Sequence, residues 1–315
     1  MSTDDLEAAV LGAPVELTRD EVSELAGVPE VQARALWTAM GFPEVAPGER
    51  AFTRRDAEAL RLAFELLDSG VFDLDTLLVL ARAMGQGMAR LAETHVGTLR
   101  GAAMELEPAE AVDAATAAAT EVLPGLEQLV VHVWRRQLAA ATARSVAAFG
   151  HEGLPVLAVG FVDLEGFTRT SREWAVSDLE RLLERFERET SLRVTQRGGR
   201  VIKTLGDAVL YVCDDVASAA EVALETVQAH TADPDLPAVR AGVALGPVLV
   251  RLGDVFGQPV NLASRLTDEA RPGTVLVDLH AAHELEQLPA YELVRLHSRS
   301  VRGYSSLRPH VLRRG

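Results

Sequence analysis

Acidic residues stand close to glycines at three places in the second half of the chain. Asp163 ends the apolar segment VLAVGFVD, Asp207 follows Gly206 between two strand-like segments, and Asp254 follows Gly253. Carboxylates at strand ends suit hard cations such as Mg²⁺, because these ions prefer oxygen ligands. Pairs of Asp and Gly are also common in ordinary turns. Each acid alone therefore predicts a turn as well as it predicts a metal ligand.

Two further polar residues follow Asp254, in the segment VNLASR. Asn261 and Arg265 are four positions apart, so on a helix they lie on one face and can contact one ligand together. An amide and a guanidinium in this arrangement are suited to orienting a sugar and neutralising a phosphate. The alternative is an ordinary exposed helix face.

Lys203 is the only lysine among 31 basic residues, and all the others are arginine. This bias suggests a GC-rich genome, and against it the one retained lysine is a candidate for a functional role. The 46 acidic residues give a net charge of −15, which argues against a nucleic-acid partner.

Further classes of protein are excluded by composition. Cys213 is the only cysteine, so neither a disulfide framework nor a cysteine-based zinc site is expected. No apolar segment approaches the roughly 20 residues that a transmembrane helix needs, and the acidic N-terminus is unlike a signal peptide. We therefore expect a cytoplasmic protein without a transmembrane segment.

The second half alternates between strand-like and helical segments, and these must position the residues above. Helices that alternate with hairpin strands predict an α+β fold with one sheet and helices packed on one face. The expected strands are Val156–Asp163, two runs in VTQRGGRVIKTLGDAVLYVC, segments within Val239–Arg251, and Thr274–Asp278; the expected helices are Ser177–Leu192, Val216–His230 and Asn261–Glu269.

The first half is predicted to be all-helical. Apolar residues recur at helical spacing, separated by Gly, Pro and Asp. A breaker-free stretch from Leu129 to Phe149 predicts a long helix leading into the second half. We expect a helical regulatory domain over residues 1–128, a connecting helix and linker over 129–153, and a catalytic domain over 154–315.

Residues Leu17–Leu60 resemble the helix-turn-helix and wing of MerR-type DNA-binding domains. Read functionally, this resemblance would make the protein a DNA-binding regulator. However, the predicted recognition helix opens with Pro29-Glu30 and acids outnumber arginines around it. Because DNA binders of this kind need a basic face, we prefer a packing or sensing module.

Four motifs, FVDLEGFT, VIKTLGDAV, VRAGVALG and DVFGQPVNLASR, occur in the order seen in class III nucleotidyl cyclases. The resemblance covers Leu157 to Val277 and implies a ferredoxin-like βαββαβ catalytic domain. The helical first half resembles the regulatory domain of actinobacterial pH-sensing adenylyl cyclases.

The resemblance implies a role for each matching residue. Asp163 and Asp207 would bind two Mg²⁺ or Mn²⁺ ions. Lys203 and Asp254 would recognise the adenine ring, and Arg240 the triphosphate. The pair that would orient the ribose and stabilise the transition state is Asn261 and Arg265.

In this family each site is composite, with the two metal-binding aspartates and the arginine from one chain and the other four residues from its partner. A homodimer with ATP as substrate is therefore implied. Backbone amides of the loop after the first strand are suited to binding phosphates; this loop contains Leu164, Gly166, Phe167 and Thr168.

The predicted function is conversion of ATP to 3′,5′-cyclic AMP and pyrophosphate. The alternatives are a guanylyl cyclase, an inactive cyclase-homology module that binds nucleotide, and the DNA-binding regulator. His132 is the candidate pH switch of the connecting helix, since histidine titrates near neutral pH. Arg299 or Arg302 is a candidate for a further phosphate contact.

Overall fold

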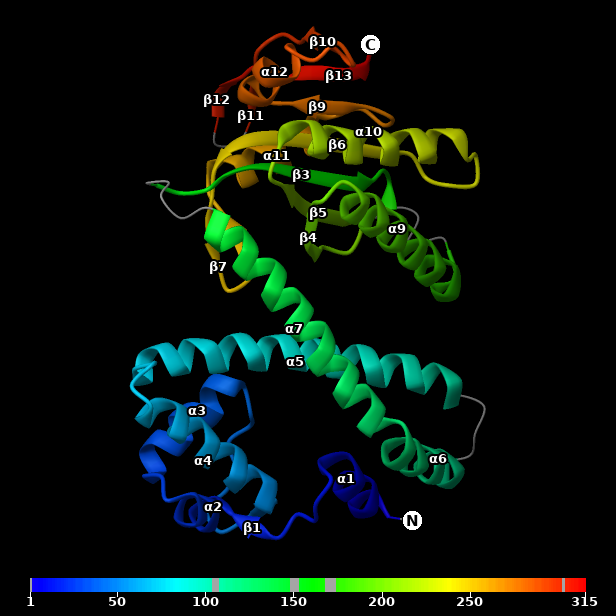
Figure 1. Ribbon diagram of the computed structural model, residues 1–315. Coiled ribbons are helices and arrows are strands. Elements are labelled where there is room, and N and C mark those ends of the chain that lie inside the picture. Colours follow the sequence, from blue (N-terminus) through cyan, green and yellow to red (C-terminus); the bar gives the residue numbers. More distant parts are fainter. Residues whose placement is uncertain (1, 104–107, 148–152, 168–173, 302–303) are drawn as a thin grey trace. The chain divides into compact units, whose positions relative to one another are not determined.

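The computed structural model of the chain divides into two compact units, residues 1–147 and 148–315 (Figure 1). It describes residues 2–103, 108–147, 153–167, 174–301 and 304–315. Each unit has an apolar core of its own. Within these described ranges, no helix combines the length and the apolar character needed to cross a membrane.

The N-terminal unit consists of helices with well-defined ends. Thr18 and Thr53 each form a capping box at a helix start, and Gly27 ends a helix with a φ of 71°. Trp37 and Phe52 pack in the core with ring centroids 4.9 Å apart. The helical prediction is confirmed, with one short strand pair added. The elements are α1 (Thr3–Leu11), β1 (Leu17–Thr18), α2 (Arg19–Ala26), α3 (Glu30–Met40), β2 (Arg50–Phe52), α4 (Arg54–Asp68), α5 (Leu74–Ala103), α6 (Pro108–Glu121) and α7 (Leu123–Ala147).

The segment that resembles a helix-turn-helix is formed by α2 and α3, with the β1–β2 pair beside them. Its arginines contact acids of the same unit. Arg19 lies 3.2 Å from Glu30, and Arg54 lies 2.8 Å from Glu16. These guanidinium groups therefore partly neutralise the acidic surface of their own unit.

The described strands of the C-terminal unit include a seven-stranded sheet in the order β10-β13-β9-β6-β3-β5-β4. Its central part has the chain order β3-α9-β4-β5-α10-β6, with β3 antiparallel to both β5 and β6. This is the expected ferredoxin-like βαββαβ arrangement, which is confirmed. The elements are β3 (Val156–Leu164), α9 (Val176–Gln196), β4 (Arg200–Thr204), β5 (Ala208–Cys213), α10 (Val216–Ala232), β6 (Val239–Pro247), β7 (Leu249–Arg251), β8 (Asp254–Phe256), α11 (Gln258–Glu269), β9 (Val275–Val277), α12 (Leu279–Leu285), β10 (Tyr291–Arg295), β11 (Arg299–Val301), β12 (Tyr304–Leu307) and β13 (His310–Arg314).

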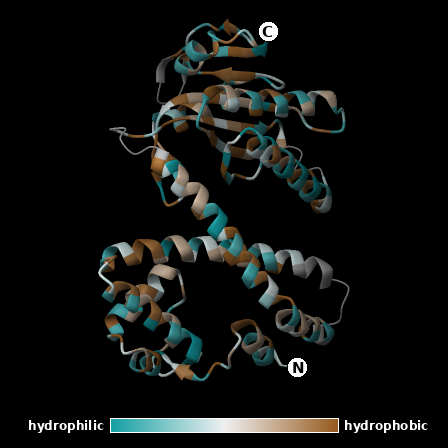
Figure 2. Ribbon diagram, viewed as in Figure 1, coloured by the Kyte–Doolittle hydropathy of each residue, from teal (hydrophilic) through white to brown (hydrophobic). Residues whose placement is uncertain are grey.

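Helices cover both faces of this sheet, so the expectation that they pack on one face was wrong. Alternate residues of β3 point to opposite sides. Ala158 and Val162 join the core formed with α9, α10 and α12, whereas Val159 and Phe161 join the core that contains Leu266 of α11. The reason is that β3 contributes apolar residues to the cores on both of its sides, and both sides must be covered. Figure 2 colours the central strands largely as hydrophobic.

Helix α11 lies directly against β6 at Gly242. A Cβ atom added at this glycine would lie 2.4 Å from the carbonyl oxygen of Ala263 and 2.5 Å from the nitrogen of Thr267. No side chain fits at that distance, so glycine is what allows the close approach. The close packing of α11 on this face of the sheet therefore depends on the contact between its backbone and Gly242.

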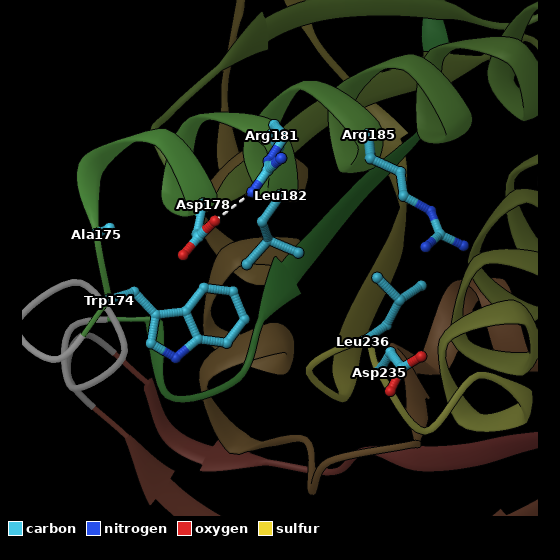
Figure 3. A pocket seen from close by; sticks show the side chains of 8 residues that line it. All are labelled: Trp174, Ala175, Asp178, Arg181, Leu182, Arg185, Asp235 and Leu236. Carbon is cyan, nitrogen blue, oxygen red and sulfur yellow. Dashed lines mark hydrogen bonds and ion pairs between the residues drawn. The ribbon is translucent and has the colours of Figure 1, made fainter.

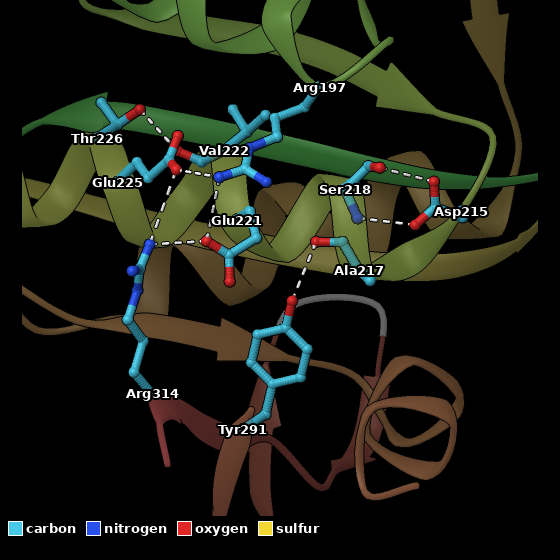
Figure 4. A network of polar contacts seen from close by, with 10 residues as sticks. All are labelled: Arg197, Asp215, Ala217, Ser218, Glu221, Val222, Glu225, Thr226, Tyr291 and Arg314. Carbon is cyan, nitrogen blue, oxygen red and sulfur yellow. Dashed lines mark hydrogen bonds and ion pairs between the residues drawn. The ribbon is translucent and has the colours of Figure 1, made fainter. Parts of the chain in front are cut away.

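The C-terminal strands are fastened to α10 by a network of charged and polar groups (Figure 4). Arg314 lies 2.7 Å from Glu221 and 3.8 Å from Glu225, and Arg197 contacts the same two acids. The hydroxyl of Tyr291 donates to the backbone of α10, and burial raises its pKa to about 12. This network ties β10, β13 and α9 to one helix.

Candidate active site

Asp163 lies at the end of β3, between Ala208 of β5 and Arg240 of β6. Its side chain is 15% exposed, and its Oδ2 atom accepts from both Nε and Nη2 of Arg240 at 2.8 Å. Burial raises the pKa of Asp163 above its ordinary value, although the hydrogen bond and the charge of Arg240 act to lower it. Burial therefore disfavours the ionised form of Asp163, and the guanidinium of Arg240 partly compensates for this cost.

Asp207 is brought to the same edge of the sheet by the turn between β4 and β5. Gly206 permits this turn with a φ of 71°. The carbonyl oxygen of Asp207 accepts from the amide of Leu164 at 2.9 Å, and the amide of Glu165 donates to Ala238 at 2.8 Å. The loop after β3 is thus fixed to two neighbouring loops, and the charge of Asp207 contributes to the raised pKa of Asp163.

The chemistry of these donors suits a divalent cation. Asp163 and Asp207 offer carboxylate oxygens, and the guanidinium of Arg240 stands where a cation would contact Asp163. In the ranges that the structure describes, no three His, Cys, Asp or Glu side chains form a complete metal site. Two carboxylates without a third fit Mg²⁺, which usually takes its other ligands from water and substrate phosphates.

The backbone after Asp163 forms the turn predicted to contact phosphate. Leu164 is buried in the core, and Gly166 has a φ of 74°. Phe167 packs partly buried against the same core as Leu164. Thr168 and Arg302 lie outside the described residues, and Arg299 begins the short strand β11.

Lys203 and Asp254 contact each other directly, although 51 positions separate them. The Nζ atom of Lys203 lies 2.5 Å from Oδ2 of Asp254, with the side chains 35% and 28% exposed. Oδ1 of Asp254 accepts from the amide of Val255 at 2.8 Å. A donor and an acceptor are therefore held side by side at a partly open position.

Helix α11 carries three polar residues of interest. Asn261 is exposed, and Arg265 lies one turn further along the helix. The Nη1 atom of Arg265 donates to Oδ2 of Asp268 at 3.0 Å. The carbonyl oxygen of Asp268 accepts from Nη1 of Arg240, also at 3.0 Å. One residue at the end of α11 thus contacts two arginines of the predicted site.

Asp163, Lys203 and Arg240 lie on the face of the seven-stranded sheet that α11 covers. Asp163 points to the same side of β3 as Phe161, and Lys203 stands opposite Leu210, which belongs to the same apolar core as Phe161. Arg240 reaches this face to contact Asp268. The site residues therefore form two groups of side chains: Asp163 with Arg240, and Lys203 with Asp254.

Sequence reasoning missed two acids that contact Arg240. Glu165 lies 3.5 Å from its Nε atom, and Asp268 provides the carbonyl described above. Asp268 follows Asn261 by seven positions and Arg265 by three, so its helical spacing was the signal that could have identified it.

His132 lies on α7 and is exposed, as are the other described side chains from Val131 to Val146. A different histidine, His230 of α10, is buried. Its Nδ1 atom lies 2.9 Å from the carbonyl oxygen of Pro237, and burial lowers its pKa. The segment after His230 leads to Arg240, so this imidazole supports a loop beside the site.

A groove of about 620 Å³ lies between α9 and the loop that precedes β6 (Figure 3). Three of its charged groups form ion pairs: Arg181 contacts Asp178, and Arg185 lies 2.8 Å from Asp233. None of the predicted site residues lines it. The lining residues are Trp174, Ala175, Asp178, Arg181, Leu182, Arg185, Asp235 and Leu236.

Comparison with known proteins places these features in a family. Residues 151–314 match the family described as adenylate and guanylate cyclase catalytic domain. An adenylate cyclase of Streptomyces coelicolor is 42% identical over 284 residues, which cover 89% of this chain and 74% of that protein. An adenylate cyclase of Glutamicibacter nicotianae is 34% identical, covering 98% and 82%. A pH-sensitive adenylate cyclase of Mycobacterium tuberculosis is 31% identical, covering 82% and 67%.

Proposed function

This chain belongs to the family of class III adenylate and guanylate cyclases and is an adenylate cyclase of the actinobacterial type; we propose that it forms 3′,5′-cyclic AMP and pyrophosphate from ATP at composite sites of a homodimer. The observation that carries this proposal is the pair of residue groups on the α11 face. One group, around Asp163 and Arg240, suits a metal-bound triphosphate. The other, Lys203 with Asp254, suits a base.

Lys203 and Asp254 together offer the donor and the acceptor that one edge of adenine requires. The ammonium group donates to a ring nitrogen, and the carboxylate accepts from the exocyclic amine. Guanine carries an N–H and a carbonyl oxygen at the corresponding positions, so the same placement would bring donor against donor and acceptor against acceptor. The 2.5 Å contact between the two side chains supports this role, because it holds an ammonium donor and a carboxylate acceptor side by side.

Asp163 and Asp207 would hold Mg²⁺ or Mn²⁺, two ions per site. When bound, these ions activate the ribose 3′-hydroxyl and offset the charge of the triphosphate. Arg240 then exchanges its contact with Asp163 for oxygens of the triphosphate. Amides of this turn beyond Glu165 would add hydrogen bonds to the phosphates, since those of Leu164 and Glu165 donate to Asp207 and Ala238.

The reaction forms one P–O bond and breaks another. The 3′-oxygen attacks the α-phosphorus, pyrophosphate leaves in line, and the hydroxyl proton passes to solvent. Asn261 orients the ribose, and Arg265 stabilises the charge that develops on the α-phosphoryl oxygens. No side chain is needed as a covalent nucleophile.

The proposal is tested by incubating the full chain with ATP or GTP in the presence of Mn²⁺ or Mg²⁺ and quantifying cyclic nucleotide by mass spectrometry. We expect cyclic AMP with ATP and much slower turnover of GTP. Binding of ATP without any cyclic product under all conditions would instead favour the inactive nucleotide-binding module.

The homodimer rests on the presence of both residue groups in one chain. The hairpin β7–β8, which carries Asp254, exposes Leu249, Val250 and Phe256. Such an apolar surface beside the base-binding pair is suited to contact with a second copy.

We predict that two inactive variants restore each other. Asp163→Asn removes a metal ligand and Arg265→Ala removes the transition-state arginine, so each homodimer has two damaged sites. In a heterodimer one site carries both defects and the other carries neither. Mixing the two variants after subunit exchange is expected to recover up to about a quarter of the parent activity, as measured by cyclic AMP formation. Mixing Asp163→Asn with Asp207→Asn is the control, since both defects then lie in the same group; equal rates in the two mixtures would contradict composite sites.

We further propose that the helical unit regulates catalysis, with His132 on α7 as the candidate pH-responsive group. A truncated chain that begins near Leu154 is expected to differ from the full chain in rate and in pH profile. His132→Gln in the full chain is expected to flatten the pH profile while leaving the maximal rate within about twofold. Identical profiles for the full and truncated chains, measured from pH 5.5 to 8.5, would rule out regulation by this unit.

A further inference from the structure

Asp268 stands where an acid is unfavourable for the helix itself. It lies in the last turn of α11, which ends at Glu269 and has no basic residue in that turn. The exposed carbonyl groups there carry partial negative charge, so an acidic side chain weakens this end of the helix. Interaction with the helix dipole therefore does not explain an acid at this position, and its contacts with other side chains must be considered.

Both kinds of oxygen on Asp268 contact an arginine. Oδ2 accepts from Nη1 of Arg265 at 3.0 Å, and the carbonyl oxygen accepts from Nη1 of Arg240 at 3.0 Å. Arg240 in turn contacts Asp163 at 2.8 Å. Within one protomer a continuous chain of hydrogen bonds thus runs from the metal-binding carboxylate to the arginine assigned to the transition state, although in the proposed homodimer these two groups serve different sites.

The contact leaves Arg265 able to bind substrate. A guanidinium carries five N–H donors in a planar fork, and the contact with Asp268 uses Nη1. With that edge fixed, the remaining donors are directed away from Asp268. A long side chain that is 38% exposed would otherwise sample several orientations.

From this geometry we infer that Asp268 is a positioning residue for the cyclase reaction, which holds Arg265 by one edge so that its other donors meet the α-phosphoryl group. The inference rests on the proposed function of Arg265. The carbonyl of Asp268 fixes the end of α11 to Arg240, and the carboxylate sets the direction of the guanidinium. Asp268 itself does not contact the nucleotide.

Asp268→Ala separates these two contacts, because every variant keeps the carbonyl that binds Arg240. We expect kcat to fall about three- to tenfold, since a partly exposed ion pair contributes modestly and misplacement of a catalytic group adds to the loss. The KM for ATP should stay within about twofold, because the base and the β- and γ-phosphates are bound by other residues. The unfolding temperature should not decrease, given the unfavourable position of the acid.

A double-mutant cycle tests whether Asp268 acts through Arg265. Arg265→Ala is expected to reduce kcat about a hundredfold. Adding Asp268→Ala to that variant should cause no further loss, because the group that it positions is gone. Glu284→Ala, which removes an exposed acid from α12, is the matched control and should leave kcat unchanged. Independent, multiplicative losses in the double variant would overturn the inference.

A second measurement needs no catalysis. Phenylglyoxal modifies accessible guanidinium groups, and peptide mass spectrometry of the nucleotide-free full chain reports the rate at each arginine. In Asp268→Ala, Arg265 should react several-fold faster, while the exposed Arg271 serves as an internal reference. An unchanged rate at Arg265 would show that Asp268 does not hold it, whether or not the chain forms cyclic AMP. Faster labelling in a chain without cyclase activity would support the contact and refute the proposed function instead.

Discussion

Asp163→Asn is expected to lower cyclic AMP formation at least about a hundredfold while raising the unfolding temperature at neutral pH. The loss of activity follows from the loss of a carboxylate that would bind the divalent ions. Their contribution to the barrier is several kcal/mol, and each ~1.4 kcal/mol is a factor of ten in rate. The gain in stability follows from burial of the charge.

The sign of the stability change comes from the raised pKa of Asp163. A carboxyl group whose pKa is higher in the folded than in the unfolded protein binds its proton more tightly when folded. Stability is therefore lost as the pH rises above the ordinary value of 3.8 and through the folded pKa. Asparagine has no charge to bury, so the gain in unfolding temperature should be full at pH 7 and should vanish below about pH 3.5.

Calorimetry at pH 7 and at acidic pH measures this effect beside the cyclase assay. Asp214→Asn is the matched control, because Asp214 is an exposed acid that follows β5 outside the site. The control should change neither the rate nor the unfolding temperature. A less stable Asp163→Asn variant would mean that the contact with Arg240 outweighs the cost of burial.

Lys203→Arg is expected to lower kcat/KM for ATP about 10- to 100-fold in a normally folded protein. A charge-assisted hydrogen bond contributes roughly 1.5–3 kcal/mol, and each ~1.4 kcal/mol is a factor of ten. The ammonium lies 2.5 Å from Asp254, so the longer planar guanidinium must shift that carboxylate or displace the base. Folding should tolerate the change, since β4 is the edge strand of the sheet and the side chain is 35% exposed.

The control for Lys203→Arg is the opposite exchange on the same strand. Arg200→Lys alters a half-buried residue that lies 3.4 Å from Asp214, outside the base-binding pair. Steady-state kinetics with ATP should be unchanged in this variant. Near-parental kinetics of Lys203→Arg would show that the solitary lysine reflects codon usage alone.

The local features of the catalytic unit could be predicted from the sequence. The apolar run that ends at Asp163 forms β3, the turn at Gly206 joins β4 to β5, and the segment with Asn261 and Arg265 forms α11. These features depend on residues close together in the chain, through periodicity and turn preference. The motifs that indicated the family lie in these same segments.

The contacts of the site depend instead on residues far apart in the chain. Arg240 meets Asp163 across 77 positions, and Lys203 meets Asp254 across 51. No local pattern specifies such pairs, because strand order and register bring them together.

The sequence by itself determined the central elements of the catalytic unit, the family and the types of residue in the site. Only the tertiary structure decided that α11 covers the second face of the sheet and that Asp268 joins Arg240 to Arg265. The physical reason is that β3 is apolar on both sides, and Gly242 lets a helix approach the backbone of β6 within contact distance. The end of that helix then presents a carbonyl and a carboxylate to two arginines from different elements.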